Sequence, residues 1–235
     1  MVVDENTYAV KPRDAKLVPV ENSDAVFPVR RVYCVGKNYD DHVKEMGGNP
    51  TSSTPVFFMK PADAVIVAPK GGTCHIPYPP QTKNLHHEIE LVVAIGRGGE
   101  NISEENAQSC IFGYGVGVDL TRRDLQATAK KKGTPWELAK GFDSSAPMSP
   151  LTKSNELVSS GSIWLSVNGE KRQEGDIKDM IWDVSAVVAM LSNYFRLEAG
   201  DLIFMGTPSG VGPLHVGDRV DGGVDNIGGL SFSVS

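Results

Sequence analysis

Two glutamates separated by one residue, Glu88 and Glu90, begin an apolar run with the alternation of a β-strand. Successive side chains of a strand point to opposite faces, so both carboxylates share one face, about 7 Å apart along the strand. A second strand-like run, 112–119, ends in Asp119. Three carboxylates from two strands favour a hard divalent cation held by oxygen, Mg²⁺ or Mn²⁺. Taken alone, the two glutamates are more typical of a solvated strand face.

The run that ends in Asp119 carries three glycines on the face of that carboxylate: Gly113, Gly115 and Gly117. A strand face without side chains lets a ligand or another backbone approach closely. We therefore expect this bare face to be a surface against which a ligand lies.

A histidine and a glutamate, His42 and Glu45, lie three residues apart in a short predicted helix that Asp40 or Asp41 would cap. This spacing places both side chains on one side of the helix. A carboxylate there orients the imidazole and raises its basicity, which gives a base able to activate water. In isolation the same pair is more typical of a solvated surface helix.

The segment that follows this helix, from Gly47 to Pro55, is rich in glycine, serine, threonine and proline. Few apolar side chains are present to anchor it. We expect residues 41–55 to be mobile without ligand and to close over the substrate as a lid.

Other side chains suggest anion contacts. Lys140 is a candidate to stabilise an oxyanion, although a lone lysine in a loop is usually solvated. The glycine-rich segment 206–212 follows an apolar strand and predicts either an anion nest, with the Thr207 hydroxyl as an added donor, or a plain turn. Arg123 and Gln126 share one face of a predicted helix.

Two charged or metal-ligating patterns carry less weight. The run 130–132 is three lysines before a glycine, which is typical of a solvated helix C-terminus rather than a phosphate site. His86 and His87 are adjacent on a strand and therefore point to opposite faces. At most one of them could join Glu88, so zinc is the weaker choice of metal.

Composition excludes several classes of protein. The chain has 235 residues, 40% hydrophobic and 22% charged, which is ordinary for a globular domain. A net charge of −6 argues against a general nucleic-acid-binding protein, which needs a basic surface. Three scattered cysteines argue against a disulfide scaffold. No apolar run approaches the roughly 20 residues of a membrane span, so we expect a soluble cytoplasmic protein.

Patterning predicts an N-terminal extension over residues 1–30 and one β-rich α+β domain over 31–235. Besides the short helix of His42 and Glu45, two more are predicted, one from a capping-box-like start at 121–124 to about Gly133, and a longer one over 177–197. Asn168-Gly169 predicts a type I′ hairpin turn between two strands. Further short strands are predicted over 32–35, 56–59 and 201–205.

Six motifs, in their order along the chain, resemble the fumarylacetoacetate hydrolase family from about Val32 to the C-terminus. They are Gly36-Lys37-Asn38-Tyr39 with His42 and Glu45, Phe57-Phe58-Met59-Lys60-Pro61, Glu88-Ile89-Glu90, the segment 117–126, Lys140-Gly141-Phe142-Asp143, and Gly206-Thr207-Pro208. Two other segments make the chain most similar to the small acylpyruvate and fumarylpyruvate hydrolases: Pro79-Pro80 and Pro135-Trp136-Glu137. Lys37 stands where the family more often has arginine, which keeps the charge but loses bidentate carboxylate binding.

This resemblance implies a fold and a set of roles. The fold is a mixed β-roll or barrel with few helices, usually assembled as a homodimer. Glu88, Glu90 and Asp119 would ligate Mg²⁺ or Mn²⁺, and Lys140 would lie beside a bound enolate. His42 and Glu45 would activate water. The substrate-binding residues would be Lys37, Lys60, Arg123, Gln126 and Thr207.

The implied reaction is hydrolysis of a 2,4-diketo acid, such as fumarylpyruvate or another acylpyruvate, chelated by the metal. Water activated by His42 attacks the distal ketone, and carbon–carbon cleavage gives pyruvate and a carboxylic acid such as fumarate. An oxaloacetate decarboxylase or tautomerase would use the same metal and Lys140 without hydrolytic water. A protein that only binds carboxylates is disfavoured, because it has no use for the His42–Glu45 base.

Overall fold

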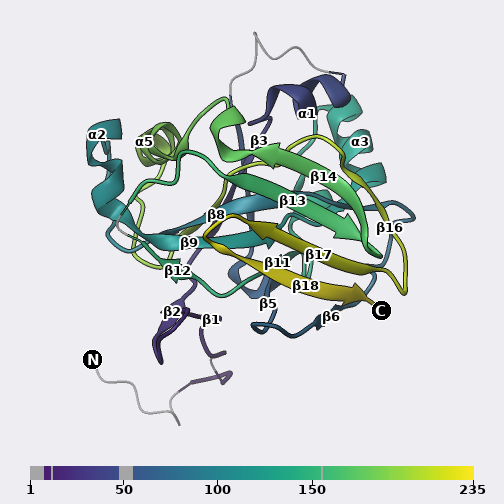
Figure 1. The fold of residues 1–235 in the computed structure, drawn as a ribbon, viewed down its shortest axis with the longest axis horizontal. Helices are drawn as coiled ribbons and strands as arrows, with labels where there is room; N and C mark the ends of the chain where they lie inside the picture. Colours follow the sequence, from purple (N-terminus) through teal and green to yellow (C-terminus); the bar gives the residue numbers. More distant parts are fainter. Residues whose placement is uncertain (1–7, 12, 48–54, 155) are drawn as a thin grey trace.

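The computed structural model describes residues 8–11, 13–47, 55–154 and 156–235. Its largest sheet has eight strands and mixes parallel with antiparallel pairs (Figure 1). In spatial order these strands are β4 (Val56–Lys60), β3 (Val32–Gly36), β15 (Leu202–Phe204), β8 (Ile89–Ile95), β9 (Ile111–Val118), β11 (Ala146–Met148) and β5 (Val65–Val67), with β12 (Thr152–Lys153) paired to β9.

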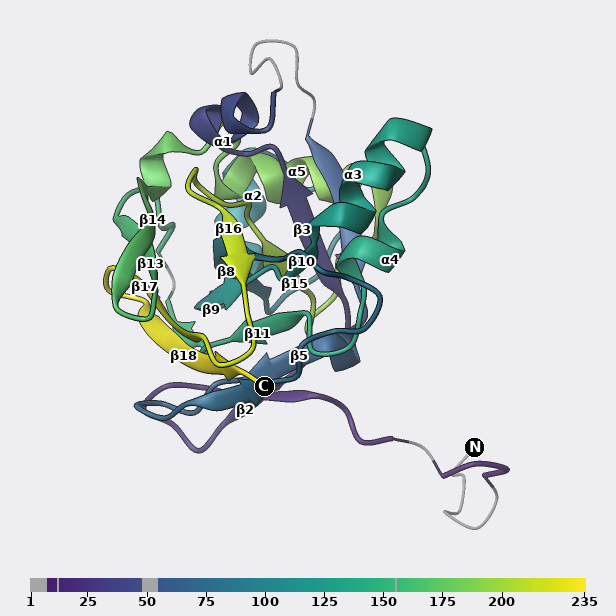
Figure 2. The ribbon, with the colours of Figure 1, turned by 90° about the vertical axis from the view of Figure 1, so that its right-hand side faces the viewer.

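A second sheet of five strands curves over one face of the first (Figure 2). Its order is β14 (Glu170–Asp176), β13 (Ser162–Val167), β17 (Arg219–Val224), β18 (Gly228–Val234) and β6 (Cys74–Ile76). Two smaller sheets complete the strands: β10 (Thr121–Arg122), β7 (Leu85–His87) and β16 (Gly212–Leu214) in one, β1 (Leu17–Pro19) and β2 (Val26–Pro28) in the other. The predicted β-rich α+β fold is confirmed.

The helices are short and lie around the sheets (Figure 2). The α-helices are α1 (Asp40–Glu45), α2 (Glu104–Ala107), α3 (Arg123–Lys132), α4 (Glu137–Lys140) and α5 (Val184–Tyr194). Single 3₁₀ turns are η3 (Ala62–Ala64), η4 (Gln108–Cys110) and η5 (Ile177–Asp179). Within the part of the chain that the structure describes, no helix has the length and apolar character needed to cross a bilayer.

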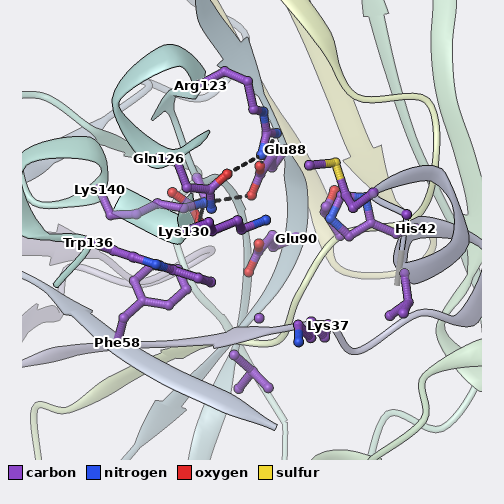
Figure 3. A pocket seen from close by; sticks show the side chains of 17 residues that line it. Lys37, His42, Phe58, Glu88, Glu90, Arg123, Gln126, Lys130, Trp136 and Lys140 are labelled. Carbon is purple, nitrogen blue, oxygen red and sulfur yellow. Dashed lines mark hydrogen bonds and ion pairs between the residues drawn. The ribbon is translucent and has the colours of Figure 1, made fainter. Parts of the chain in front are cut away.

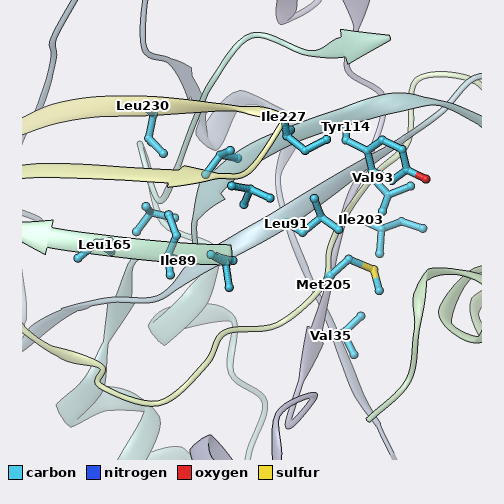
Figure 4. Packing of buried hydrophobic residues seen from close by; sticks show 14 of the residues in the cluster. Val35, Ile89, Leu91, Val93, Tyr114, Leu165, Ile203, Met205, Ile227 and Leu230 are labelled. Carbon is cyan, nitrogen blue, oxygen red and sulfur yellow. The ribbon is translucent and has the colours of Figure 1, made fainter. Parts of the chain in front are cut away.

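Strand β8 is buried over its whole length because both of its faces are covered. One face contributes four side chains to the main core between the two large sheets (Figure 4): Ile89, Leu91, Val93 and Ile95. On the opposite face Val92 and Ala94 join a second apolar cluster. By strand alternation Glu90 and Glu88 continue that second face, so their carboxylates are placed at the end of an apolar row.

Part of the predicted N-terminal extension packs on the domain. Strands β1 and β2 form an antiparallel pair, and their Val18 and Phe27 are buried in the second cluster. The backbone of Val20 pairs with Leu151 beyond it. These contacts cover the face of the eight-stranded sheet opposite the main core.

The glycine face of β9 is covered by protein, so the expectation of a ligand against it is wrong. A Cβ at Gly117 would lie 2.4 Å from Phe204 Cε1 and 2.7 Å from Val92 Cγ2. A Cβ at Gly113 would lie 2.3 Å from the Thr152 carbonyl oxygen. The glycines therefore admit neighbouring strands and core side chains rather than substrate.

The predicted helix over 177–197 is two elements, η5 and α5. Its apolar stripe is interrupted by Asn38, whose Oδ1 accepts a hydrogen bond from the Trp182 backbone N–H at 2.8 Å. Asp183 then begins α5 as its N-cap and accepts from the Ala186 N–H at 2.9 Å. A contact with a residue 144 positions away thus overrides the local helical pattern.

Two helix starts also differ from the predictions. Helix α1 begins after Tyr39, and both aspartates expected as caps lie in its first turn. Helix α3 begins after Arg122, because Thr121 pairs within a sheet and Asp124 binds the Thr82 hydroxyl at 2.6 Å instead of capping.

The predicted end of α3 and the predicted hairpin turn are confirmed. Gly133 follows the helix with φ of +65°, the left-handed cap that favours glycine. Asn168 and Gly169 join β13 to β14 with φ of +54° and +80°, as a type I′ turn requires.

Replacing Gly117 with alanine should destabilise the fold. The added methyl group would overlap Phe204 and Val92, and overpacking of this kind costs about 1–3 kcal/mol. Denaturant unfolding measures the loss. Gly212→Ala is the matched control, because its Cβ would meet only His87 Nε2, at 3.4 Å. Equal stability of the two variants would contradict the close packing at Gly117.

Candidate active site

Three carboxylates meet where β8 begins and β9 ends. Glu90 lies in β8, Glu88 precedes it and Asp119 follows β9. The backbone N–H of Asp119 donates to the Glu88 carbonyl at 2.8 Å, which joins the two strand ends. One oxygen from each carboxylate lies within 4.8 Å of the other two, and all three residues are buried. The predicted convergence of these side chains is confirmed.

Buried cations lie among the carboxylates. Lys140 Nζ donates to Glu88 Oε2 at 2.8 Å and to Asp119 Oδ2 at 2.6 Å. Its third contact is the Thr121 hydroxyl, at 2.6 Å. Arg123 donates from Nη2 to the other oxygen of Glu88. Lys140 therefore contacts two of the three carboxylates, Glu88 and Asp119, and its place beside a bound enolate stays a prediction.

The pKa values of Glu88 and Glu90 shift in opposite directions. Burial opposes the charge on Glu88, but Lys140 and Arg123 outweigh it and hold the pKa of Glu88 well below its usual range. Burial raises the pKa of Glu90 well above its usual range, and the negative charges of Asp119 and Glu88 add to that effect. Glu90 is the carboxylate whose charge is least compensated by protein cations.

The donor set fits Mg²⁺ or Mn²⁺, because it consists of carboxylate oxygens on a rigid frame. Asp119 Oδ1 is buried and accepts no well-aligned hydrogen bond from the described residues, although the charge of Lys60 lies 2.8 Å from it. On Glu90, the backbone N–H of Gly206 donates to Oε2 at 2.8 Å and so fixes the carboxylate. A buried carboxylate oxygen that accepts no well-aligned hydrogen bond can still serve as a ligand for a cation.

His42 is a buried side chain of α1 that faces the glutamates across a cavity (Figure 3). Its Nδ1 lies 3.2 Å from Glu45 Oε2. Burial lowers the pKa of His42, although Glu88 and Glu45 act in the opposite direction. A neutral imidazole that donates from Nδ1 to Glu45 presents Nε2 as a proton acceptor.

The predicted lid spans residues 41–55. The first part of this range belongs to helix α1. The helix contacts the 206–212 segment, because Glu45 Oε1 accepts a hydrogen bond from the Gly210 backbone N–H at 3.1 Å. Residues 48–54 lie outside the described residues, so closure of a lid stays a prediction.

Arg123 and Gln126 share one face of α3 and line the cavity. Arg123 donates from Nη1 to Gln126 Oε1 at 2.6 Å and from Nε to His86 Nδ1 at 3.3 Å. His86 in turn pairs with Asn84 Oδ1 at 2.9 Å. Burial and the charge of Arg123 lower the pKa of His86 to about 4. A neutral His86 is thus an acceptor that positions Arg123, a role that the sequence did not suggest.

Lys60 lies behind Asp119 rather than in the cavity. Its buried ammonium group donates to the carbonyl oxygens of Leu120, at 3.1 Å, and of Lys140, and lies 2.8 Å from Asp119 Oδ1. Its ammonium group is thus held by backbone carbonyls and by the charge of Asp119, and Lys60 is not among the residues that line the cavity. The structure therefore makes Lys60 a positioning residue for Asp119, which corrects the predicted substrate contact.

The 206–212 segment directs its first N–H to a protein carboxylate, Glu90, rather than to an open anion nest. Thr207 does line the cavity, and its hydroxyl accepts from Gln173 Nε2 at 2.8 Å. Gln173, a buried residue of β14, also accepts from the Ile89 backbone N–H at 3.1 Å. This amide joins the five-stranded sheet to the start of β8, and no pattern in the sequence pointed to it.

The two histidines before Glu88 do not join the carboxylates. His87 Nδ1 pairs with Gln173 Oε1 at 2.8 Å, while His86 is engaged with Asn84 and Arg123. Their positions agree with the choice of a metal bound by oxygen.

A cavity of about 230 Å³ opens onto the carboxylates (Figure 3). Of the predicted residues outside the carboxylate group, six line it: Lys37, His42, Arg123, Gln126, Lys140 and Thr207. Phe58, Lys130 and Trp136 line it without having been predicted as site residues. Lys130 was expected at a solvated helix end. Its position four residues after Gln126 was the available signal, because that spacing shares a helix face.

Replacing Lys60 with methionine should lower the free energy of unfolding by about 3–5 kcal/mol, because it removes one partner of a buried ion pair with Asp119. Chemical denaturation of the metal-free protein measures this. Lys70→Met is the control, since Lys70 pairs with Glu21 at the surface, where such a pair is worth about 1 kcal/mol or less. A loss no larger than that of the control would overturn the positioning role.

Comparison with known structures gives close matches over nearly the whole chain. The fumarylpyruvate hydrolase of Pseudomonas aeruginosa, solved with Mn²⁺ and pyruvate, is 47% identical with a TM-score of 0.95, covering 97% of this chain and 98% of that one. A putative fumarylpyruvate hydrolase from Burkholderia cenocepacia is 52% identical with a TM-score of 0.89 and the same coverage.

A curated relative is named for a different reaction from that of these two hydrolases. The mitochondrial oxaloacetate tautomerase FAHD1 of Mus musculus is 42% identical over 207 residues, which is 87% of this chain and 91% of that protein. The family model described as fumarylacetoacetate (FAA) hydrolase C-terminal matches residues 31–235. The chain therefore belongs to the fumarylacetoacetate hydrolase family.

Proposed function

We propose that the protein is a metal-dependent hydrolase that cleaves a carbon–carbon bond of a 2,4-diketo acid, fumarylpyruvate or another acylpyruvate. The products are pyruvate and a carboxylic acid such as fumarate. The observation that carries the proposal is buried His42, paired with the more exposed Glu45, which faces three buried carboxylates across one cavity. The similarity to a fumarylpyruvate hydrolase solved with Mn²⁺ and pyruvate supports it.

Glu88, Glu90 and Asp119 would hold Mg²⁺ or Mn²⁺. When bound, such a cation supplies Lewis-acid stabilisation of the negative charge on the pyruvoyl oxygens. Arg123 fixes one oxygen of Glu88, and Lys60 faces Asp119 from the side away from the cavity. The protein thus keeps its ligand oxygens in place before any substrate arrives.

His42 would take a proton from water at Nε2, while Glu45 holds the ring and stabilises the imidazolium that forms. The hydroxide adds to the C4 carbonyl carbon of the diketo acid. The C3–C4 bond then breaks, its electron pair passes to C3 as the enolate of pyruvate, and the acyl group leaves as a carboxylic acid. The proton held by His42 returns to C3, so water is the only added reactant.

Lys140 lies where the enolate charge would develop, beside Glu88 and Asp119. Its ammonium group is buried and fixed by three acceptors, so little reorganisation accompanies the reaction. Gln126 and Thr207 line the same cavity and would contact the substrate's oxygens. We also infer a homodimer and a cytoplasmic location, in line with the family resemblance and the composition.

Oxaloacetate tautomerase is the second candidate, because the curated relative at 42% identity has that name. That reaction moves a proton between C3 and the 2-oxo oxygen and consumes no water. It would use the same carboxylates and Lys140. Assays of fumarylpyruvate cleavage and of oxaloacetate tautomerisation and decarboxylation on one preparation distinguish the candidates.

Activity should require a divalent cation, and Glu88→Ala, Glu90→Ala and Asp119→Ala should each abolish it, because the carboxylates form one oxygen donor set. Pyruvate release with and without added Mg²⁺ measures this. Glu174→Ala, at an exposed position of β14, is the control and should retain full activity. Full activity in excess chelator would reject the metal site.

His42→Ala should lower fumarylpyruvate cleavage by a typical general-base factor, about 10²–10⁴-fold, and leave binding of oxalate with Mg²⁺ nearly intact. His75→Ala, an exposed histidine on β6, is the matched control. If His42→Ala loses fumarylpyruvate cleavage but keeps oxaloacetate turnover, His42 serves as the base in hydrolysis. Near-normal cleavage by His42→Ala would remove the role assigned to His42.

The pH profile tests the same base. Because the folded-state pKa of His42 is lowered below its usual 6.5, the base form persists under mildly acidic conditions, and kcat/KM should fall only as pH drops below about 6.5. Glu45 raises that pKa, so Glu45→Gln should move the acidic limb to lower pH while reducing the rate. An acidic limb that moves upward in Glu45→Gln would contradict the pairing.

A further inference from the structure

The cavity wall formed by α3 carries a cation that the mechanism above does not use. Lys130 lies one turn beyond Gln126 and two turns beyond Arg123, so the three side chains follow one face of the helix. All three line the cavity, and Figure 3 shows Lys130 extending into it. Because Arg123 contacts Glu88, the row runs from the carboxylates at one end to Lys130 about 10 Å along the helix axis.

Aromatic rings hold Lys130 in this orientation. Its Nζ lies 5.3 Å from the centroid of the Trp136 ring, within the range of a cation–π contact. The Trp136 ring packs in turn on Phe58, with centroids 5.8 Å apart. Both rings line the cavity, so the ammonium group of Lys130 lies at the cavity wall although the residue is also accessible to solvent.

Lys130 has no anionic neighbour of its own. Among the residues that the structure describes, no carboxylate oxygen lies within 4.0 Å of its Nζ, whereas Lys140 has two such contacts. Burial lowers the pKa of Lys130, and the positive charge of Arg123 lowers it further. An anion placed next to this ammonium group would relieve both effects.

The charges around the cavity also favour binding of an anion. Its lining has four cationic side chains, Lys37, Arg123, Lys130 and Lys140, against three carboxylates. A divalent cation on the carboxylates would leave the cavity strongly positive. A ligand with one carboxylate at the metal end would compensate only part of this charge.

We propose that Lys130 is a substrate-binding residue that receives a second carboxylate, at the acyl end of the diketo acid. The substrate class is then a dianionic diketo acid with a carboxylate at each end, such as fumarylpyruvate, rather than an acylpyruvate with a neutral acyl group. This assignment rests on the proposed function, because it takes the pyruvoyl end to lie at the three carboxylates. The aliphatic stem of Lys130 and the Trp136 ring line the path between the two ends.

The test compares two ligands that cannot be cleaved between C3 and C4, because they lack the 4-oxo group. 2-Oxoheptanedioate carries a terminal carboxylate and 2-oxoheptanoate carries a methyl group in its place. Calorimetry on the full chain with Mg²⁺ should show the dioate bound about 10- to 100-fold more tightly, as expected for a hydrogen bond between two charged groups. Lys130→Met should abolish that preference, and Lys130→Arg should restore most of it.

Lys131→Met is the matched control, since Lys131 is the next residue of α3 and does not line the cavity. It should keep the preference for the dioate. Equal affinity of the unaltered protein for the two ligands, or an undiminished preference in Lys130→Met, would overturn the assignment. Pyruvate release from fumarylpyruvate is measured in parallel. A preserved preference without pyruvate release would count against the proposed hydrolase and leave the carboxylate site standing.

Discussion

The constraint on which the site depends is the burial of three carboxylates within a few ångströms of one another. Removing such charges from water is costly unless cations and hydrogen-bond donors surround them. Arg123, Lys140 and Lys60 supply that compensation from three separate elements, α3, α4 and β4. The compensation is incomplete at Glu90, whose pKa is raised well above its usual range. A divalent cation would remove this imbalance, so the metal site and the arrangement of the cations form one electrostatic unit.

The fold provides the rigidity that this arrangement needs. Strand β8 has an apolar cluster on each face, so its position is set by packing before any charge is considered. Gln173 then ties the five-stranded sheet to the start of β8 and to Thr207 in the cavity wall. Asn38 joins the segment before α1 to Trp182 and Met205. Buried amide side chains of this kind hold loops that carry the chemistry.

Under the proposed function, the site has a side that would activate water and a side that would recognise the substrate. His42 and Glu45 lie on α1, while Arg123, Gln126 and Lys130 follow one face of α3, with the carboxylates between them (Figure 3). The carboxylates and Lys140 suit any reaction through a pyruvate-like enolate. In the proposed reaction the residues on α1 would activate water, and those at the end of α3 would select the acyl group.

The sequence by itself determined whatever depends on near neighbours. Alternation placed Glu88 and Glu90 on one face, three-residue spacing paired His42 with Glu45, and Asn168-Gly169 specified its turn. Only the tertiary structure decided features that depend on distant segments. The contact of Asn38 with Trp182 divided a predicted helix, and core side chains filled the glycine face of β9. Likewise Lys60 lies behind Asp119, 59 positions away in sequence, and the ammonium group of Lys130 lies over the Trp136 ring. A lysine has the same local pattern in either setting, and its role is set by the acceptors and rings that packing brings to it.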